Sequence, residues 1–272
     1  MKQNSSNPLP IKGNYAICLK ITWMIATAML ISAISSLIFK SAIYPTDELI
    51  RSFLANDIVN ILIGIPIMII PIQLVKSNKL IGLLLWLGAL LFALYNYLIY
   101  LLSLPFSFIY VLYILIILLC GIVLYKLLKN IDSKGIKSAI SKVISNRWIS
   151  ALLIVFGLMF LSRAAMQIGN HFLGQAHLPI TEIALNIADI IFSLVWISCG
   201  IAFLRRKPLG YVTSLGLLYQ LCMLFIGLIL VLIIQPIIMN EPLPIVDLIV
   251  LAIMSLIVIV PFFIYVKALR SK

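Results

Sequence analysis

The stretch LIGLLLWLGALLFALYNYLIYLL (Leu80–Leu102) contains no charged residue over a length that is sufficient to cross a bilayer. Such a stretch predicts a transmembrane helix, because only a helix or a closed barrel satisfies its backbone hydrogen bonds inside lipid. The rest of the chain has the same character, since 64% of its 272 residues are hydrophobic and 10% are charged. With a mean hydropathy of +1.21, this composition excludes a soluble globular domain.

Seven further apolar stretches are long enough to span a membrane, and only short connections separate them. The sequence therefore predicts an all-α integral membrane protein without a soluble domain. The first stretch contains ISAISS, which resembles a signal-peptide cleavage site, but the charged segment 1–20 precedes it and we interpret it as a span. The eight predicted transmembrane helices are Ile21–Phe39, Ile58–Val75, Leu80–Leu102, Phe106–Tyr125, Trp148–Phe172, Ile183–Leu204, Tyr211–Ile234 and Ile245–Val266.

Basic residues are distributed unevenly among the connections. If the N-terminus faces the cytoplasm, 17 of the 20 basic residues lie on the inner side, and Lys40, Arg51 and Arg163 lie in the outer half. Of the eight acidic residues, only Asp132 then lies inside. Because cytoplasmic loops are enriched in lysine and arginine, we expect both termini in the cytoplasm and the chain in the plasma (cytoplasmic) membrane. Anionic headgroups of the inner leaflet then explain the net charge of +12, without nucleic acid as a partner.

The two halves of the chain resemble each other. Residues 57–88 (DIVNILIGIPIMIIPIQLVKSNKLIGLLLWLG) align with residues 186–216 (NIADIIFSLVWISCGIAFLRRKPLGYVTSLG) with one gap. The spans that follow begin alike, with SLPFSFIYVLYI and PLPIVDLIVLAI. Four spans per unit bring each unit back to its starting side, which predicts two parallel four-helix repeats around an axis along the membrane normal. A seam between two such units is a usual place for a ligand. The coincident glycines are Gly82 with Gly210 and Gly88 with Gly216.

The segment KLLKNIDSKGIKSAISKVISNRW (Lys126–Trp148) joins the two units. Its apolar residues recur at helical spacing with lysines on other faces, which predicts a short amphipathic helix lying on anionic headgroups. An acidic partner is the alternative. The apolar positions are Ile136, Ala139, Ile140, Val143 and Ile144, and the lysines are Lys134, Lys137 and Lys142. The predicted organisation is a cytoplasmic N-terminal segment (1–20), a first membrane unit (21–127), the linker (128–147), a second membrane unit (148–267) and a cytoplasmic tail (268–272).

Arg163 lies inside the fifth predicted span, in FLSRAAMQIGNHF (Phe160–Phe172). Counted from Trp148, it lies about 22 Å along the helix, in the outer third of the hydrocarbon core. Asp189 reaches about 24 Å on the sixth span, counted from Arg205. Because a lone charge in lipid costs at least about 2.5–3.5 kcal/mol, we expect the two side chains to form an ion pair.

Further polar residues are predicted to lie at this level, in a polar layer across the outer half of the bundle. Those of the second unit share a helix face with Arg163 or Asp189, and those of the first unit include the motif D-I-V-N, which aligns with N-I-A-D. Their alternative role is structural, since amides and ion pairs also hold membrane helices together. The candidate ligand-binding residues are Arg163, Asp189, Asn186, Asp57, Asn60, Asn96, Gln167 and Asn170.

The second predicted span contains Gly64, Pro66 and Pro71. Because proline removes a backbone donor and kinks a helix, we expect this span to be bent or locally broken at mid-membrane. Interrupted spans in both halves would indicate a transport site, but the sixth span has only Gly200 at the corresponding place.

Motifs for catalysis or metal binding are weak. His171, His177 and Glu182 lie in one outer loop and would offer three metal ligands, but their spacing matches no helix-borne motif. The four cysteines form no C-x-x-C pair, so they indicate neither a disulfide framework nor a zinc site. We therefore expect no catalytic residue, metal or cofactor.

Two classes of function fit these observations. The first is a small-solute binder or permease, in which an outward-facing polar pocket between the two repeats takes a small polar or anionic ligand. The second is a non-transporting accessory or sensor subunit, in which the polar residues fix helix packing or contact a protein partner that the sequence does not identify. The first hypothesis requires Arg163 or Asp57 to face a water-filled cavity, and the second requires both to be paired and dry. An intramembrane enzyme is the weaker third hypothesis.

Overall fold

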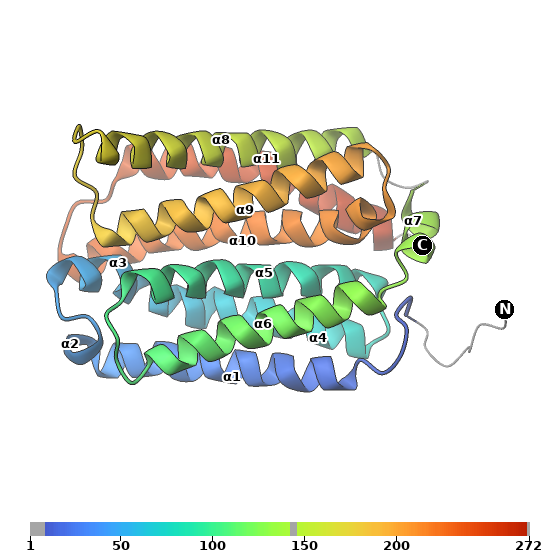
Figure 1. The fold of residues 1–272 in the computed structure, drawn as a ribbon, viewed down its shortest axis with the longest axis horizontal. Coiled ribbons are helices and arrows are strands. Elements are labelled where there is room, and N and C mark those ends of the chain that lie inside the picture. Colours follow the sequence, from blue (N-terminus) through green and yellow to red (C-terminus); the bar gives the residue numbers. More distant parts are fainter. Residues whose placement is uncertain (1–8, 142–145, 271–272) are drawn as a thin grey trace.

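The computed structural model describes residues 9–141 and 146–270 of the chain. Within these ranges eight helices are long and apolar enough to cross a membrane, as predicted. They lie side by side in one bundle, and α1 begins at the end of the bundle where α11 finishes (Figure 1). The spans are α1 (Ala16–Ile38), α3–η1–α4 (Asp47–Val59, Asn60–Gly64 and Ile65–Lys76), α5 (Leu80–Ser103), α6 (Tyr110–Asn130), α8 (Asn146–Phe172), α9 (Ile180–Leu204), α10 (Pro208–Met239) and α11 (Ile245–Arg270). The short helices α2 (Lys40–Ile43) and α7 (Ser133–Ile140) mark opposite ends of the bundle, called here the α2 end and the α7 end.

The second span begins earlier than its hydropathy predicts, at Asp47 instead of Ile58. Thr46 caps the helix, because its Oγ1 accepts a hydrogen bond from the backbone N–H of Leu49 at 3.3 Å. Asp47 and Glu48 lie in the first turn, where negative charge interacts favourably with the helix dipole. These first turns bury one face only, so their mean hydropathy is low and does not indicate a span.

The predicted interruption of the second span is a π-helical turn, η1, between α3 and α4. The N–H of Ile65 bonds to the C=O of Asn60, so this turn is one residue wider than an α-helical turn. Pro66 follows directly, at the start of α4. The wider turn accommodates a proline, which has no N–H to donate and whose ring crowds the preceding α-helical turn. The span therefore changes its hydrogen-bond register and continues without a break.

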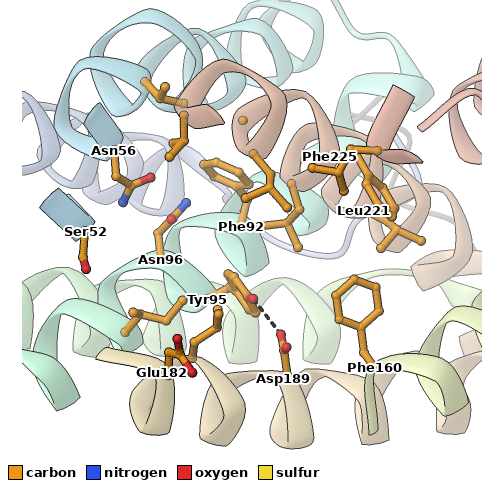
Figure 2. A pocket seen from close by; sticks show the side chains of 18 of the residues that line it. Ser52, Asn56, Phe92, Tyr95, Asn96, Phe160, Glu182, Asp189, Leu221 and Phe225 are labelled. Atoms are coloured by element: carbon orange, nitrogen blue, oxygen red, sulfur yellow. Dashed lines mark hydrogen bonds between the residues drawn. The ribbon is translucent and has the colours of Figure 1, made fainter. Parts of the chain in front are cut away.

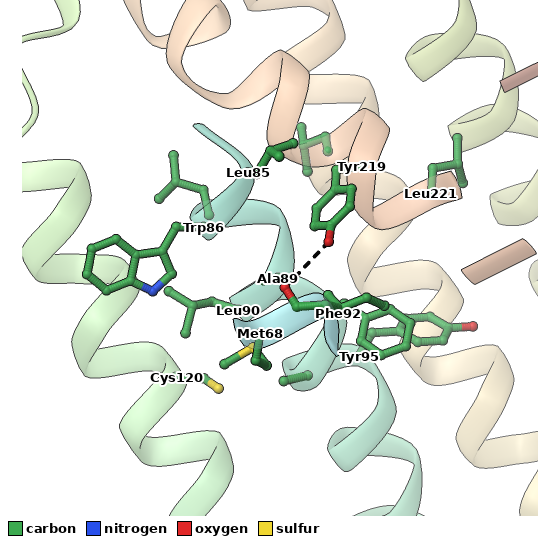
Figure 3. Packing of buried hydrophobic residues seen from close by; sticks show 14 of the residues in the cluster. Met68, Leu85, Trp86, Ala89, Leu90, Phe92, Tyr95, Cys120, Tyr219 and Leu221 are labelled. Carbon is green, nitrogen blue, oxygen red and sulfur yellow. Dashed lines mark hydrogen bonds between the residues drawn. The ribbon is translucent and has the colours of Figure 1, made fainter. Parts of the chain in front are cut away.

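The centre of the bundle is the contact between α5 and α10. Gly88 of α5 lies so close to Gly216 of α10 that a Cβ on Gly88 would overlap with the Gly216 carbonyl oxygen. Small residues permit such close backbone approach between membrane helices. On the other side of α5, the apolar core includes Met68, Trp86 and Cys120 from three helices (Figure 3).

The turns α4–α5 and α9–α10 have the same local structure. Asn78 and Arg206 adopt left-handed backbone conformations, with φ of 56° and 53°. Four backbone hydrogen bonds surround each turn in the same order, at lengths between 2.9 and 3.1 Å. Gly82 and Gly210 then pack against the backbone of the preceding helix, where a Cβ would not fit. Two different sequences thus build one and the same tight turn.

The apolar face of α7 packs on the protein. Ile136 and Ile140 are fully buried, and α7 contacts α10. The prediction that this face lies on lipid headgroups is therefore wrong for these two residues, because the end of the bundle offers an apolar surface of its own. Ala139 is exposed, and contact between the linker lysines and headgroups stays a prediction. Lys142, Val143 and Ile144 lie outside the described residues.

Candidate functional site

A cavity of about 650 Å³, called here the central cavity, lies between the two halves of the chain. Helices α3 and α5 line it from the first half, and α8, α9, α10 and α11 line it from the second. Its volume suits one small molecule. Polar side chains gather at one end and apolar side chains at the other (Figure 2). The polar end includes Ser52, Asn56, Asn96 and Glu182, and the apolar end includes Phe160, Leu221 and Phe225.

Arg163 and Asp189 form an ion pair in the wall of the central cavity, which confirms the pairing expected from their depths. Nη2 of Arg163 lies 2.6 Å from Oδ2 of Asp189, and Oδ1 accepts a hydrogen bond from the Tyr95 hydroxyl at 2.7 Å. The side chain of Asp189 is 1% exposed and that of Arg163 is 42% exposed. The Asp189 carboxylate is thus held by donors from two helices, while the Arg163 side chain, which also lines the cavity, stays partly exposed.

The third candidate residue in the lining is Asn96, which is 7% exposed. Gln167 and Asn170 of α8 are half-buried and lie outside the described lining. The backbone C=O of Asn170 accepts a hydrogen bond from the N–H of Gln175 at 2.9 Å, which closes the end of α8. The face that these residues share with Arg163 therefore runs past the cavity into the loop.

Asp57 and Asn60 lie in a buried cluster in the first half, outside the described lining of the cavity. Asn56 of the lining connects this cluster with the cavity, because its Nδ2 donates to the Tyr100 hydroxyl of the cluster at 3.0 Å. Asp57 accepts hydrogen bonds from the Tyr44 hydroxyl at 2.5 Å and from the Tyr100 hydroxyl at 2.8 Å. The Tyr100 hydroxyl also accepts a hydrogen bond from Nδ2 of Asn60 at 3.3 Å. Burial, and next the charge of Asp57, raise the pKa of Tyr44, so its hydroxyl remains a donor.

Asn186 of α9 is fully buried, and neither its Oδ1 nor its Nδ2 has a hydrogen-bond partner among the described residues. A buried amide without partners costs about 1–3 kcal/mol for each unpaired group unless water reaches it. The predicted polar layer is thus divided into four parts: the cavity wall, the Asp57 cluster, the isolated Asn186, and Gln167 with Asn170 at the end of α8. Only the first part belongs to the described lining of the cavity.

Several residues of the cavity lay outside the set expected from the sequence. Helix α3 contributes Ser52 and Asn56, and the first turn of α9 contributes Thr181 and Glu182. All four precede the predicted starts of their spans, Ile58 and Ile183. The sequence therefore did not place them on a membrane helix at the level of Arg163. The signal in the sequence that places Ser52 and Asn56 on the helix is the cap at Thr46 with the amphipathic turns that follow it.

Gln220 connects three helices beside the cavity and was also not expected. It is fully buried on α10. Its Oε1 accepts a hydrogen bond from Nε1 of Trp196 at 3.3 Å, and its Nε2 donates to the C=O of Leu91 at 3.3 Å. Trp196 lines the cavity, so Gln220 fixes the orientation of one wall residue.

Two polar contacts join the halves at the α2 end. Nη1 of Arg51 lies 2.5 Å from Oε1 of Glu241, and Oγ1 of Thr181 donates to Oε1 of Glu48 at 3.0 Å. The Arg51 and Glu241 side chains are 51% and 38% exposed, so this ion pair contributes little to stability. It provides a matched exposed counterpart to the Arg163–Asp189 pair.

The loop after α8 is ordered by one of its histidines. Nδ1 of His171 accepts a hydrogen bond from the backbone N–H of Leu178 at 3.2 Å, and the rings of His171 and His177 lie 5.9 Å apart. Within the described ranges, no group of three or more His, Cys, Asp or Glu side chains is arranged to hold a metal ion.

Comparison with protein-family models, with curated proteins and with solved structures found no match to this chain. The functional argument therefore depends on the geometry of the site.

Proposed function

We propose that this chain is a multi-pass protein of the plasma membrane that takes a small molecule into the central cavity, as a small-solute binder or permease. One observation carries the proposal: the Arg163–Asp189 pair lies in the wall of an open cavity, with 42% of the Arg163 side chain exposed. A charge inside a span is costly and is typical of a functional site. A pair that served packing alone would be enclosed on both sides.

We infer further that the two halves are parallel repeats. The shared turn around Asn78 and Arg206 supports this, as does the contact of Gly88 with its aligned partner Gly216 at the centre of the bundle, where a two-fold axis would pass. The π-turn η1 adds one residue to the second span, which accounts for the gap in the alignment of the halves. In this arrangement, movement of one repeat against the other would open and close the cavity between them.

Most lysines and arginines lie in the segments that connect the spans at the α7 end, and this distribution favours a cytoplasmic location for that end. The polar end of the central cavity includes the first turns of α3 and α9, which lie at the α2 end (Figure 1). In this orientation the polar end opens to the outside of the cell. Solutes from outside would then meet Glu182 and Thr181 first and Arg163 deeper in the cavity.

A second candidate function is a non-transporting accessory or sensor subunit, and the Asp57 cluster favours it. Asp57 is 1% exposed and both of its carboxylate oxygens accept hydrogen bonds from tyrosines, which meets the condition of a paired and dry group. The first half would then serve helix packing alone. A binder or permease requires Arg163 to face a water-filled cavity, whereas an accessory subunit requires it to be paired and dry.

The test is a thermal-shift screen of the detergent-purified protein against amino acids, sugars, anions, cations and lipids. Arg163→Gln is the test variant, and Arg51→Gln is the matched control, because it removes an ion pair outside the cavity. We expect at least one compound that raises the Tm of the wild type and of Arg51→Gln but not that of Arg163→Gln. If no compound does so, the binder proposal is wrong and the accessory function is favoured.

A further inference from the structure

The charges in the central cavity do not favour an anion. Of the described residues that line it, Arg163, Glu182 and Asp189 are charged. The charge of Arg163 is already compensated by Asp189 at 2.6 Å. Glu182 is exposed and takes part in no salt bridge within the described ranges. The lining therefore carries a net negative charge, located at its polar end.

The surroundings of the polar end are acidic as well. Negative potential at the mouth of a cavity concentrates cations there and repels anions. Acidic residues outnumber basic residues in the connections and first helical turns at the α2 end. The basic residues there are Lys40 and Arg51, and the acidic residues are Asp47, Glu48, Glu182, Glu241 and Asp247.

Deeper in the cavity the walls are aromatic and aliphatic. The faces of aromatic rings attract cations, and the Arg163 guanidinium already lies over the ring of Phe160, 5.9 Å from its centroid. The apolar end has room for an alkyl or aryl group and offers few polar partners to a sugar or an amino acid. The aromatic residues of the lining are Phe53, Phe92, Tyr95, Phe160, Trp196 and Phe225.

Some residues that line the cavity on the side of α8 and α10 are also exposed. In the first half α1 packs along α6, but α8 and α11, which hold the same places in the proposed repeat, make almost no contact with each other within the described residues. Met159 of α8 and Leu251 and Met254 of α11 all line the cavity. Met159 is 38% exposed and Leu228 of α10 is 44% exposed, although both line the cavity.

We propose that the ligand of the central cavity is an amphipathic cation that enters from the membrane between α8 and α11. Its charged head lies at the polar end beside Glu182, and its apolar part lies between Phe160 and Phe225. This inference rests on the proposed function and names the ligand class of the same site. The sequence led us to expect a small polar or anionic ligand, and the present inference excludes an anionic one.

The test uses quenching of Trp196 fluorescence in protein reconstituted into lipid nanodiscs. Trp23 and Trp148, which are 39% and 78% exposed, are replaced by Phe so that Trp196 and the buried Trp86 remain. Trp86 lies outside the described lining and serves as the internal reference. Three probes carry the same bromine-terminated alkyl chain and differ only in their head, which is trimethylammonium, hydroxyl or carboxylate.

We expect saturable quenching by the trimethylammonium probe, at a half-saturating concentration about fivefold below that of the carboxylate probe. Trp196→Phe abolishes the saturable part, and Glu182→Gln reduces the preference for the cation to less than about twofold. Leu251→Phe with Met254→Phe narrows the proposed entry and slows binding several-fold. The lipid-facing Ile253→Phe, at a position 57% exposed, leaves the rate unchanged.

Two results would overturn the inference, and they have different consequences. If the carboxylate or the hydroxyl probe binds as tightly as the cation, the ligand class is wrong but the cavity remains a binding site. If no probe gives saturable quenching of Trp196, an amphiphile is not the ligand, and the thermal-shift screen with Arg163→Gln decides separately whether the cavity binds any solute.

Discussion

Arg163 shows how one charged residue restricts its surroundings inside a membrane. A lone arginine at this depth is costly, and the structure provides Asp189 on the neighbouring helix, with Tyr95 as a second donor to the carboxylate. The pair could be expected from the sequence because depth along two consecutive helices depends only on residue counts and helical rise. The tyrosine could not, because α5 is distant in the sequence and its rotation about its own axis is set by packing.

The energetic role of the pair is testable by a double-mutant cycle. Arg163→Gln leaves the buried Asp189 carboxylate with Tyr95 alone, and we expect a loss of about 1–3 kcal/mol, seen as a Tm lower by several degrees. Asp189→Asn in the same chain removes the uncompensated charge and restores part of that loss. A double variant less stable than Arg163→Gln would show that Asp189 is held mainly by contacts other than the arginine.

The buried Asp57 cluster marks the limit of residue-level inference. The sequence assigns Asp57 and Asn60 to the same polar layer as Arg163. In the structure they turn toward Tyr44 and Tyr100, away from the central cavity. Which side of a span faces a cavity depends on how the helices pack. Polar residues occur on more than one face of α3, where Ser52 and Asn56 line the cavity and Asp57 does not, so the sequence alone does not fix the rotation of this span.

At the scale of the helices, the number of spans was predictable and some boundaries were not. Eight apolar stretches with few or no charged residues are long enough to span the bilayer, and each forms a helix of the bundle. The early start of α3 at Asp47 was hidden because its first turns lie at the α2 end, where polar residues are tolerated. That error concealed Ser52 and Asn56 and thereby much of the polar end of the cavity.

The close contact between α5 and α10 predicts a strong effect of a single methyl group. In Gly88→Ala the new Cβ overlaps with the Gly216 carbonyl oxygen, so the two central helices must separate, and we expect a Tm lower by several degrees or loss of folded protein. Gly121→Ala is the matched control, because a Cβ at this position of α6 meets no atom within 4 Å. Its expected effect is neutral or slightly stabilising, from the higher helix propensity of alanine. Equal Tm values for the two variants would mean that the centre of the bundle is not packed this closely.

The π-turn predicts that one deletion in a membrane helix is tolerated. Removal of Leu62, which is 55% exposed, shortens η1 to an α-helical turn and keeps both flanking segments in register. Because Pro66 would then crowd the new turn, the deletion is combined with Pro66→Ala. We expect a folded protein with a Tm within a few degrees of the wild type, measured in detergent.

The control for that deletion is removal of Leu118, which is 58% exposed on the uninterrupted helix α6. There the deletion rotates the rest of the helix by about 100° and turns its buried face toward lipid, so we expect little folded protein. If the Leu62 deletion is equally damaging, the π-turn is required for more than the extra residue, for example to orient Asn60.

At the scale of the whole molecule, the two halves of the proposed repeat differ in how their helices close around the interior. The first half closes α1 against α6 and fills its interior with the Asp57 cluster, whereas the second half leaves α8 apart from α11 and its ion pair open to the cavity. Self-similarity in the sequence supports the proposed repeat, because the turns after α4 and α9 and the glycine positions recur. It does not indicate the difference, which arises from the distance between two helices that are not adjacent in the chain.

The proposed direction of the cavity depends on orientation in the membrane, which cysteine labelling measures directly. Gln175 lies in an exposed loop at the α2 end and Ser138 is exposed on α7, while the four native cysteines are buried or half-buried and give a low background. In intact cells we expect a membrane-impermeant maleimide to modify Gln175→Cys and to modify Ser138→Cys only after lysis. The reverse pattern would direct the polar end of the cavity, with Glu182, toward the cytoplasm. The labelling result therefore also decides toward which side of the membrane the charged head of a bound amphipathic cation lies, and from which side the ligand is offered in a transport assay.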